Sequence, residues 1–496
     1  MGGVRTALYN YLFAKANGGK FILRIEDTDR TRFVEGAEEY IIEALNWCGL
    51  TIDESDAVGG DLGPYKQSNR SQFYEDAVAQ LLTAGKAYRA FDTPEELNAL
   101  RKNAESEKKV FQYDAKTRGK CRNELSMSKD EIDSLIENCT PHVVRFKTPD
   151  TPENVVFTDE IRGKVSISSA IVDDKVLMKM DGLPTYHLAN IVDDHHMQIS
   201  HVIRGEEWLP SAPLHVLLYR AFGWDAPKFA HLPLILKPEG NGKLSKRDGD
   251  DGGFPVFPIE WKDPSSGSVS QGYRENGYKP EAFINMLLML GWNPGDEREK
   301  FTLKEAVASF SLDRIVKSGA RFSPDKAKWF NELYLRETPH EELAKELIDL
   351  ASERGVELNE SNALSIVGMM LERVSFLSDV FDANWLFEEP SIDSFNLKLV
   401  KKKWKDETAS YLEDLAVVLE KINNFKAEGI EEAFKAFLEE RELGFGQVLL
   451  PFRIALTGSG GGPSMFEFAE YLGKEATLER LNSGINKVAE IKSKLN

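Results

Sequence analysis

One short stretch near the start of the sequence decides the fold class: FILRIED, Phe21–Asp27. An apolar run that ends in charged residues is typical of a buried parallel strand with functional groups at its carboxyl end. Before it, residues 3–16 carry apolar side chains at helical spacing and stop at Asn17-Gly18-Gly19, which predicts a helix. Thr28-Asp29-Arg30 then predicts the start of the next helix. This succession predicts an α/β fold.

The α/β pattern is interrupted once and then resumes. Between about residues 93 and 182, a charged helical stretch and short β-like runs at 142–147 and 155–157 predict an α+β insertion. After Pro184 we expect, in order, a helix at 186–197, a strand at 199–203, a helix at 211–222 and an apolar run at 232–236. The sheet-forming domain is therefore split into residues 1–92 and 183–250 by an insertion at 93–182.

The second half of the chain has a different pattern. Residues 248–277 are rich in Gly, Pro and Ser, which predicts a loop or a flexible insertion. From about Pro280 onward the spacing is helical, with Ile430, Phe434 and Phe437 on one face as an example. We expect a loop insertion with its following segment at 251–340 and a helical domain at 341–496.

Composition narrows the class of protein. Lys plus Arg number 62 and Asp plus Glu number 81, a formal net charge of −19, which disfavours a protein that coats nucleic acid non-specifically. Three cysteines without paired spacing, and no signal peptide at the start, predict a reducing cytoplasm and no Cys-x-x-Cys zinc site. No apolar run approaches the roughly 20 residues of a membrane helix, so we expect no membrane association.

The most specific chemical signal is a basic loop, GKLSKRDG at 242–249. Lys243, Lys246 and Arg247 place three cations within five residues of a glycine-bounded loop just past a strand. Such a loop can close on a triphosphate and stabilise the charge of a leaving pyrophosphate. The same residues are also consistent with a solvated basic turn, and the sequence leaves both interpretations open.

A second signal follows the strand at 199–203. Arg204 can hold a carboxylate through two parallel hydrogen bonds, and the Trp208 indole can cover a purine face. Tyr186 and Asn190 are four residues apart on one predicted helix, so both can face one small substrate. The alternatives are a half-buried core tyrosine at 186 and, for Arg204, a structural ion pair with Glu26 or Glu206.

Three other segments carry weaker signals. His195-His196 lies beside two aspartates, but adjacent histidines on a helix point about 100° apart and are poorly placed to share one metal ion. The glycine-rich run 458–463 lacks the lysine and preceding strand of a phosphate loop, which predicts a connector between helices. The basic run 398–405 is consistent with RNA contact or with a solvated helix face.

These segments together resemble those of bacterial glutamyl-tRNA synthetases, which are class I enzymes. The resemblance runs nearly end to end and is carried by GGVRTALYN at 2–10, FILRIEDTDR at 21–30, GPYKQS at 63–68, PTYHLAN at 184–190, VIRGEEW at 202–208, KLSKR at 243–247, Phe330-Asn331 and PFRIALTG at 451–458. It implies a split doubly wound (Rossmann-type) α/β catalytic domain with an α+β insertion, followed by an all-α anticodon-binding region. The insertion at 93–182 would bind the acceptor stem, and 251–340 would include a stem-contact domain.

The resemblance also implies residue roles. Lys243 and Lys246 would be the catalytic residues, on the family's KMSKS-type loop. The glutamate-binding residues would be Glu26, Tyr186, Asn190 and Arg204, with Arg204 facing the carboxylate. The ATP-binding residues would be Gly2, Gly3, Glu207, Trp208, Lys243, Ser245, Lys246 and Arg247.

The implied reaction has two steps, formation of glutamyl-adenylate from L-glutamate and ATP and transfer of the glutamyl group to tRNA(Glu). We expect Mg²⁺ with ATP, no protein-bound metal and no zinc, and a cytoplasmic monomer. A glutaminyl enzyme is less favoured, because that class carries β-barrel anticodon domains. The alternative is a catalytically silent tRNA-binding form, since only Met1-Gly2-Gly3 stands where the family has its first strand and most of its HIGH signature.

Overall fold

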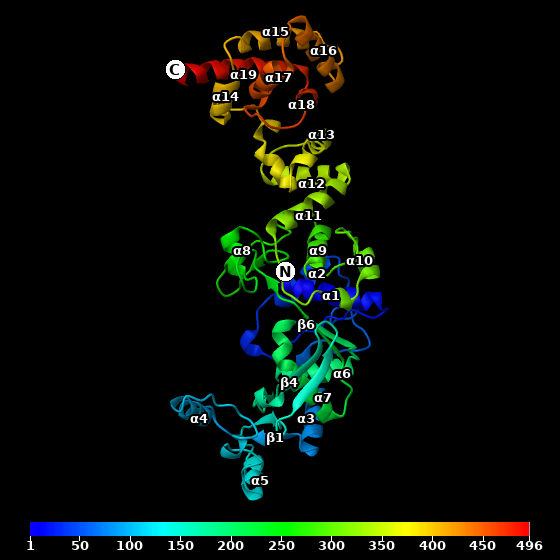
Figure 1. Cartoon of the computed structure of the whole chain (residues 1–496), viewed down its shortest axis with the longest axis vertical. Coiled ribbons are helices and arrows are strands. Elements are labelled where there is room, and N and C mark those ends of the chain that lie inside the picture. The colour runs from blue at the N-terminus through cyan, green and yellow to red at the C-terminus, as the bar shows by residue number, and fades with distance from the viewer. Residues whose placement is uncertain (496) are drawn as a thin grey trace. The chain divides into compact units, whose positions relative to one another are not determined.

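The computed structural model describes residues 1–495 and divides into two compact units (Figure 1). The first unit comprises Met1–Asn276 and Phe283–Pro324, and the second comprises Gly277–Ala282 and the chain from Asp325 onward. The first unit mixes helices and sheets, whereas the second is helical. The predicted α/β class and the predicted helical second half are both confirmed.

A four-stranded sheet with the order β4-β3-β7-β6 forms the centre of the first unit. β6 (His201–Gly205) and β7 (Lys228–Leu232) are parallel and are joined by the almost wholly buried helix α7 (Ala212–Phe222). β3 (Asn154–Asp159) meets β7 in parallel at a single pair and forms an antiparallel hairpin with β4 (Gly163–Ser168). A hairpin from the range expected to form the insertion thus extends the central sheet.

The first predicted helix is confirmed, but the elements after it differ from expectation. α1 spans Gly2–Ala16. Phe21–Asp27 is not a continuous strand: it makes isolated parallel bridges, Ile22 with Glu54 and Ile25 with Lys66. No α-helix starts at Thr28. The short 3₁₀ helix Arg30–Arg32 forms there because the Asp29 side chain accepts a bond from the Thr31 N–H, and α2 (Ala37–Trp47) begins only after Gly36, whose φ is +77°.

A second sheet, with the order β1-β2-β5, combines two strands of the range expected as the insertion with one strand that precedes it. Its strands are β1 (Ala87–Ala90), β2 (Val143–Phe146) and β5 (Val176–Met178), all paired antiparallel. Helices α4 (Pro94–Ser106) and α5 (Lys129–Glu137) each begin with a capping box, formed by Thr93 with Glu96 and by Ser128 with Glu131. α3 (Ser71–Thr83) and α6 (Tyr186–His196) connect this region to the central sheet.

Residues 248–277, predicted as a loop, contain regular structure. The segment begins within α8 (Lys246–Gly252), and its middle forms a hairpin of β9 (Trp261–Lys262) and β10 (Val269–Ser270). Gly272 permits this fold-back, because a Cβ there would lie 2.2 Å from the Ile259 carbonyl carbon. The remaining elements of the unit are β8 (Ile235–Leu236), β11 (Ala320–Arg321), α9 (Pro280–Met289, which begins in the second unit) and α10 (Leu303–Ser309).

The second unit is built from packed amphipathic helices around one apolar core. α17 and α19 approach closely, because Gly484 has no Cβ to meet the Ala455 carbonyl oxygen, which would lie only 2.1 Å away. Residues 458–463 connect α17 to α18, as predicted. The helices are α11 (Pro324–Glu337), α12 (His340–Glu353), α13 (Glu360–Met370), α14 (Leu397–Lys403), α15 (Thr408–Glu420), α16 (Ala427–Glu440), α17 (Phe445–Thr457), α18 (Met465–Leu472) and α19 (Lys474–Leu495).

Across the described residues, no helix has the length and apolar character needed to cross a membrane.

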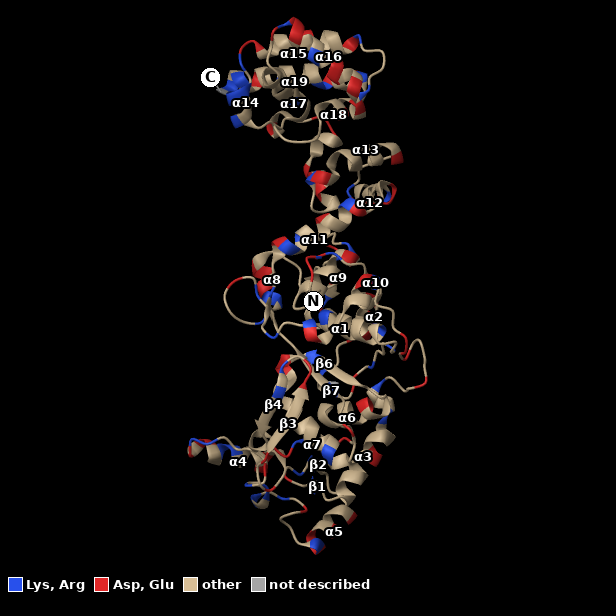
Figure 2. Ribbon diagram, turned by 45° about the vertical axis from the view of Figure 1, so that its right-hand side comes forward, with Lys and Arg blue, Asp and Glu red and all other residues tan. Residues whose placement is uncertain are grey.

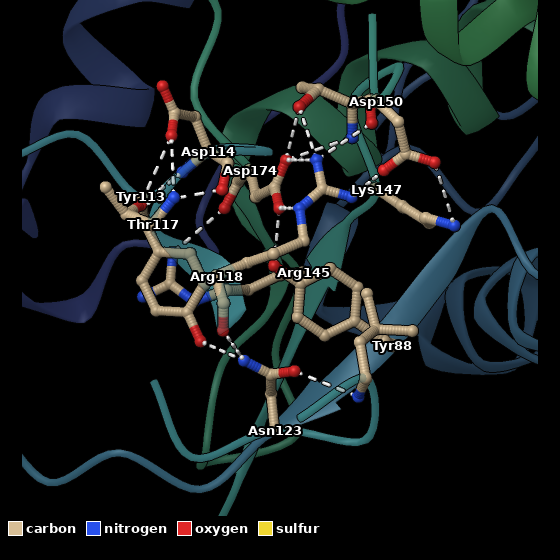
Figure 3. A network of polar contacts seen from close by, with 12 residues as sticks. Tyr88, Tyr113, Asp114, Thr117, Arg118, Asn123, Arg145, Lys147, Asp150 and Asp174 are labelled. Carbon is tan, nitrogen blue, oxygen red and sulfur yellow. Dashed lines mark hydrogen bonds and ion pairs between the residues drawn. The ribbon is translucent and has the colours of Figure 1, made fainter. Parts of the chain in front are cut away.

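A buried polar network holds the insertion together (Figure 3). Asp174 is fully buried and accepts hydrogen bonds from the Thr148 amide (2.9 Å) and the Tyr88 hydroxyl (2.5 Å). The Arg118 guanidinium lies 3.0 Å from its second carboxylate oxygen. Burial raises the pKa of Asp174, although these bonds and Arg118 oppose that rise. The contacts of Asp174 therefore join four segments that are distant in sequence, and they require two charges to be removed from water.

Arg118→Met should loosen the insertion, because it leaves the Asp174 carboxylate buried without its cation. Breaking one side of a buried pair costs about 3–5 kcal/mol, so amide hydrogen exchange in β1, β2 and β5 should accelerate by at least roughly 100-fold. Arg122→Gln is the control, because Arg122 pairs with Glu96 at the exposed surface. Unchanged exchange in Arg118→Met would show that the network does not hold these strands together.

Candidate active site

A cavity of about 1210 Å³ extends along β6 (His201–Gly205), and its lining includes His201, Val202, Ile203 and Arg204 of that strand. Its lining includes residues of α1, the 19–26 segment, α2, α6, β6 and the segment between α8 and β9. It brings together all four residues expected to bind glutamate, which are Glu26, Tyr186, Asn190 and Arg204. Gly3 also lines this cavity.

Helix α6, which presents Tyr186 and Asn190 to the cavity, is anchored by Asp193, two helical turns after Tyr186 on the same side of the helix. Asp193 is fully buried and accepts hydrogen bonds from Arg70 (2.6 Å), Gln67 (2.9 Å) and Tyr74 (2.9 Å). These donors come from the segment leading into α3 and from α3 itself. The anchored aspartate therefore fixes which face of α6 meets the cavity.

Arg24 organises the acidic side of the site. Its guanidinium bonds Asp194 at 3.0 Å and Glu26 at 3.2 Å. The Asn190 amide oxygen accepts from Arg24 at 3.2 Å when its nitrogen faces Asp194. Burial raises the pKa of Asp194, and Arg24 opposes that rise. The Glu26 side chain keeps 39% exposure, so its carboxylate remains available to a cation.

Arg204 is buried, with 8% exposure, yet no carboxylate of the described residues lies within ion-pair distance of it. The structural ion pairs considered from the sequence are not formed, because Glu26 pairs with Arg24 and Glu206 pairs with Arg162. A buried cation beside a cavity and without an anion favours an anionic ligand.

Tyr186 and Trp208 both contact Arg204, the first through its hydroxyl and the second through its backbone carbonyl. Tyr186 packs against Trp208 with ring centroids 4.6 Å apart, and its hydroxyl accepts from Arg204 at 3.4 Å. Burial raises the pKa of Tyr186, and Arg204 opposes that rise, so the phenol stays neutral at neutral pH. Trp208 is 39% exposed and does not contribute to the described cavity lining. Its indole therefore retains a free surface for a further ligand.

The basic loop lies outside the described cavity lining. Lys243 forms an exposed ion pair with Glu207 at 2.7 Å. Ser245 caps α8 through a capping box with Asp248, which places Lys246 and Arg247 in the first turn of that helix. The Lys246 ammonium lies 6.0 Å from the centre of the Phe257 ring. Gly2 and Glu207, two other residues expected to bind ATP, are also outside the described lining.

The adjacent histidines His195 and His196 pack against aromatic rings. His195 stacks on Trp224 at 3.8 Å and His196 packs against Phe73 at 4.7 Å. Among the described residues, no group of three or more His, Cys, Asp or Glu side chains is arranged to hold a metal ion.

The basic run at 398–405 places four exposed lysines on α14, at positions 398, 401, 402 and 403, and the ribbon of α14 is largely blue in Figure 2. Trp404, which directly follows α14, is buried with 5% exposure. Its indole is therefore unavailable to stack on a base. This run can therefore contact RNA through its exposed lysines and the phosphate groups, but not by stacking Trp404 on a base.

Sequence reasoning missed the residues that surround Arg204 and Glu26. Arg24 lies two residues before Glu26, so alternation along the predicted strand, which places both side chains on one face, was a usable signal. His231, His215 and Asp159 gave no local signal, because they reach Arg204 only through strand pairing and helix packing.

Comparison with known proteins gives full-length matches. Residues 1–329 match the model of the class I tRNA synthetase (E and Q) catalytic domain, and residues 340–485 match an anticodon binding domain. The glutamate–tRNA ligase of Christiangramia forsetii is 51% identical over 486 residues (98% of this chain, 96% of the relative), and that of Bacteroides thetaiotaomicron is 53% identical over 489 residues (98% and 95%). The crystal structure of an Elizabethkingia meningosepticum glutamate tRNA ligase in complex with its amino acid has a TM-score of 0.94 at 51% identity, covering 98% of this chain and 96% of that one.

Acid should weaken the fold around the site through His187. Burial, with the nearby cations Lys175 and Arg204, lowers the pKa of His187 to about 4, and Asp173 opposes this. The pKa of His187 in the folded chain lies below the ordinary 6.5 of the unfolded chain. The free energy of unfolding is therefore at its full value above pH 6.5, and it decreases as the pH falls below 6.5, because only the unfolded chain then binds the proton. His187→Asn keeps an acceptor for the neighbouring His215 but cannot be protonated.

Between pH 7.5 and 5.0 the parent chain should therefore lose about 2 kcal/mol more stability than His187→Asn. Calorimetric melting of both proteins at the two pH values measures this difference. His340→Asn is the control, since His340 lies exposed at the start of α12. Parallel pH profiles for the parent and His187→Asn would contradict the assignment.

Proposed function

This chain belongs to the class I tRNA synthetases for glutamate and glutamine, where it is a glutamate–tRNA ligase, and we propose how its own residues carry out that reaction. Full-length identity to enzymes favours an active ligase over the catalytically silent tRNA-binding alternative. The substrates are ATP, L-glutamate and tRNA(Glu).

The observation that carries the proposal is the buried Arg204 guanidinium without a carboxylate partner among the described residues. L-Glutamate has two carboxylates and one ammonium. Arg204 binds the side-chain carboxylate, and the exposed Glu26 carboxylate binds the ammonium. Tyr186 and Asn190, one helical turn apart on α6, close the sides of this subsite. The α-carboxylate then remains free to react with ATP.

In the first step, an oxygen of the α-carboxylate attacks the α-phosphorus of ATP. The bond from that phosphorus to the bridging oxygen breaks, and pyrophosphate leaves with the electron pair. Lys243 and Lys246 neutralise the charge that develops on it, with Ser245 and Arg247 on the same loop. Lys243 exchanges its present partner, Glu207, for a phosphate.

The adenosine lies against Gly2, Gly3, Glu207 and Trp208. Mg²⁺ would enter with ATP as part of the substrate and would offset the negative charge of the phosphates. The described residues contain no cluster of His, Cys, Asp and Glu that would form a protein cage for it.

In the second step, a hydroxyl of the terminal tRNA adenosine attacks the activated carbonyl carbon, and AMP leaves. The insertion at 93–182 binds the acceptor stem, 251–340 contacts the stem and 341–496 reads the anticodon. The exposed α14 lysines contribute phosphate contacts despite the net charge of −19. The enzyme acts as a monomer in the cytoplasm, a compartment that fits its three free cysteines.

Lys246→Ala should slow glutamate activation by about 10²–10³-fold, because one contact to developing charge contributes roughly 3–4 kcal/mol to the transition state. The Michaelis constant for glutamate should change little. Pyrophosphate exchange in the presence of tRNA measures both. Lys262→Ala, an exposed lysine of β9, is the control and should retain the parental rate. A full-rate Lys246→Ala enzyme would remove Lys246 from the catalytic machinery.

Arg204→Gln should weaken the preference for glutamate over glutamine, because it replaces a cation that recognises a carboxylate with a neutral amide. Arg204→Lys should also bind glutamate poorly, since a point charge lacks the two-pronged geometry of a guanidinium. Exchange assays with both amino acids measure the selectivity. Arg220→Gln, which removes an exposed pair with Glu153, is the control. Parental selectivity in both Arg204 variants would place the carboxylate contact elsewhere.

A further inference from the structure

The described hydrogen bonds of Arg204 go only to neutral acceptors. Nε donates to Nε2 of His231 at 3.2 Å, and one terminal nitrogen donates to Nδ1 of His215 at 3.3 Å. The same nitrogen reaches the Tyr186 hydroxyl, and the other lies 3.5 Å from the Trp208 carbonyl oxygen. Neutral acceptors satisfy the N–H groups without cancelling the positive charge, so the whole charge remains available to a ligand.

Asp159 fixes the proton of His231. Its carboxylate oxygen lies 2.6 Å from Nδ1 of His231, and both side chains are fully buried. A carboxylate accepts hydrogen bonds and does not donate them, so Nδ1 carries the proton. Nε2 then has a free lone pair, which is what the Arg204 Nε–H requires. Strand pairing sets this geometry, because Arg204 lies directly opposite His231 in the β6–β7 register.

Asp159 remains ionised although it is buried. Burial alone would raise its pKa, but hydrogen bonds from His231 and from the amides of Ile161 and Arg162 lower that pKa overall. Asp159 is the last residue of β3, so the carboxylate comes from the hairpin that joins the central sheet. Its negative charge is separated from Arg204 by the width of an imidazole ring.

A second histidine pair has a matching arrangement. Because His215 accepts from Arg204 through Nδ1, its proton lies on Nε2, which faces Nδ1 of His187 at 3.1 Å. Burial and the Arg204 charge hold the pKa of His215 well below its ordinary value. Both imidazoles therefore present a lone pair to Arg204.

We propose that Asp159 and His231 are positioning residues for glutamate recognition, which hold the Arg204 guanidinium in place through a fixed imidazole tautomer while leaving its charge unpaired. The proposal rests on the proposed contact between Arg204 and the substrate carboxylate. A carboxylate in the place of His231 would orient Arg204 equally well but would neutralise it, and an apolar residue would leave a buried N–H unsatisfied. The imidazole with a fixed tautomer avoids both effects.

Asp159→Asn tests the tautomer. The asparagine oxygen can still accept from the Ile161 and Arg162 amides, while its NH₂ group faces Nδ1 of His231 and donates to it. The imidazole proton then moves to Nε2 and opposes the Arg204 Nε–H. The Michaelis constant for glutamate should rise by roughly 10- to 100-fold, the range typical of lost outer-shell partners, while that for ATP stays unchanged.

Two substitutions of His231 separate positioning from simple packing. His231→Gln places an amide oxygen near the former Nε2, so it can accept from Arg204 and should preserve most of the affinity for glutamate. His231→Asn places its amide near the former Nδ1, facing Asp159, and offers nothing to Arg204, so it should resemble Asp159→Asn. In the His231→Gln background, adding Asp159→Asn should change the Michaelis constant for glutamate by less than about threefold.

The measurements are pyrophosphate exchange with tRNA, at varied glutamate and varied ATP, and thermal melting of each variant. Equal losses for His231→Gln and His231→Asn, or an unchanged glutamate constant in Asp159→Asn, would overturn the positioning role. If Asp159→Asn does not fold, the two His231 variants decide the question alone. Normal selectivity in the Arg204 variants would instead refute the proposed glutamate contact, so the two failures are distinguishable.

Discussion

Parallel pairing of β6 with β7 is the constraint on which the site depends. The register places Arg204 opposite His231, and on the other side of β7 it brings in Asp159 from the end of β3. A slip by one residue would turn Arg204 to the opposite face of the sheet. The buried helix α7, which makes the β6–β7 crossover, adds His215 to the same cluster. One strand pairing therefore assembles groups that lie as far as 72 residues apart in sequence.

The cations around the cavity fall into two groups with different physical roles. Arg24 and Arg70 are neutralised by the buried carboxylates of α6, and these pairs fix the wall of the cavity. Arg204 is surrounded by imidazoles, a phenol and a carbonyl group, so its charge is uncompensated by any carboxylate of the described residues. The ion pairs of Arg24 and Arg70 thus hold the wall of the cavity in place, whereas Arg204, which has no carboxylate partner among the described residues, can bind an anion.

The basic loop at 242–249 differs from the cavity in that its charges are exposed to solvent. Its lysines are at the surface, with Lys243 paired to Glu207 in a bond that solvent weakens. Such a contact is easily exchanged for a phosphate group. The capping box of Ser245 with Asp248 nevertheless gives the loop a defined end, where α8 begins. The loop can therefore exchange the partner of Lys243 while its backbone keeps a defined conformation at the start of α8.

The sequence by itself determined the α/β class, the helical second half, and the identity of Glu26, Tyr186, Asn190 and Arg204 as the residues that meet in one cavity. The fold class and the helical half follow from local periodicity. Side-chain chemistry at the ends of elements suggested Tyr186, Asn190 and Arg204, and the family resemblance grouped them with Glu26 in one site. Several boundaries differed by a few residues: the strand expected at 199–203 is β6 at His201–Gly205, and the apolar run at 232–236 is the end of β7 followed by β8.

Only the tertiary structure decided that the β3–β4 hairpin belongs to the central sheet, that residues 248–277 fold back on themselves, and that Asp159 and two histidines surround Arg204. Strand register and helix packing join residues that are distant in sequence. They are set by the sum of many contacts, and no local pattern reports them.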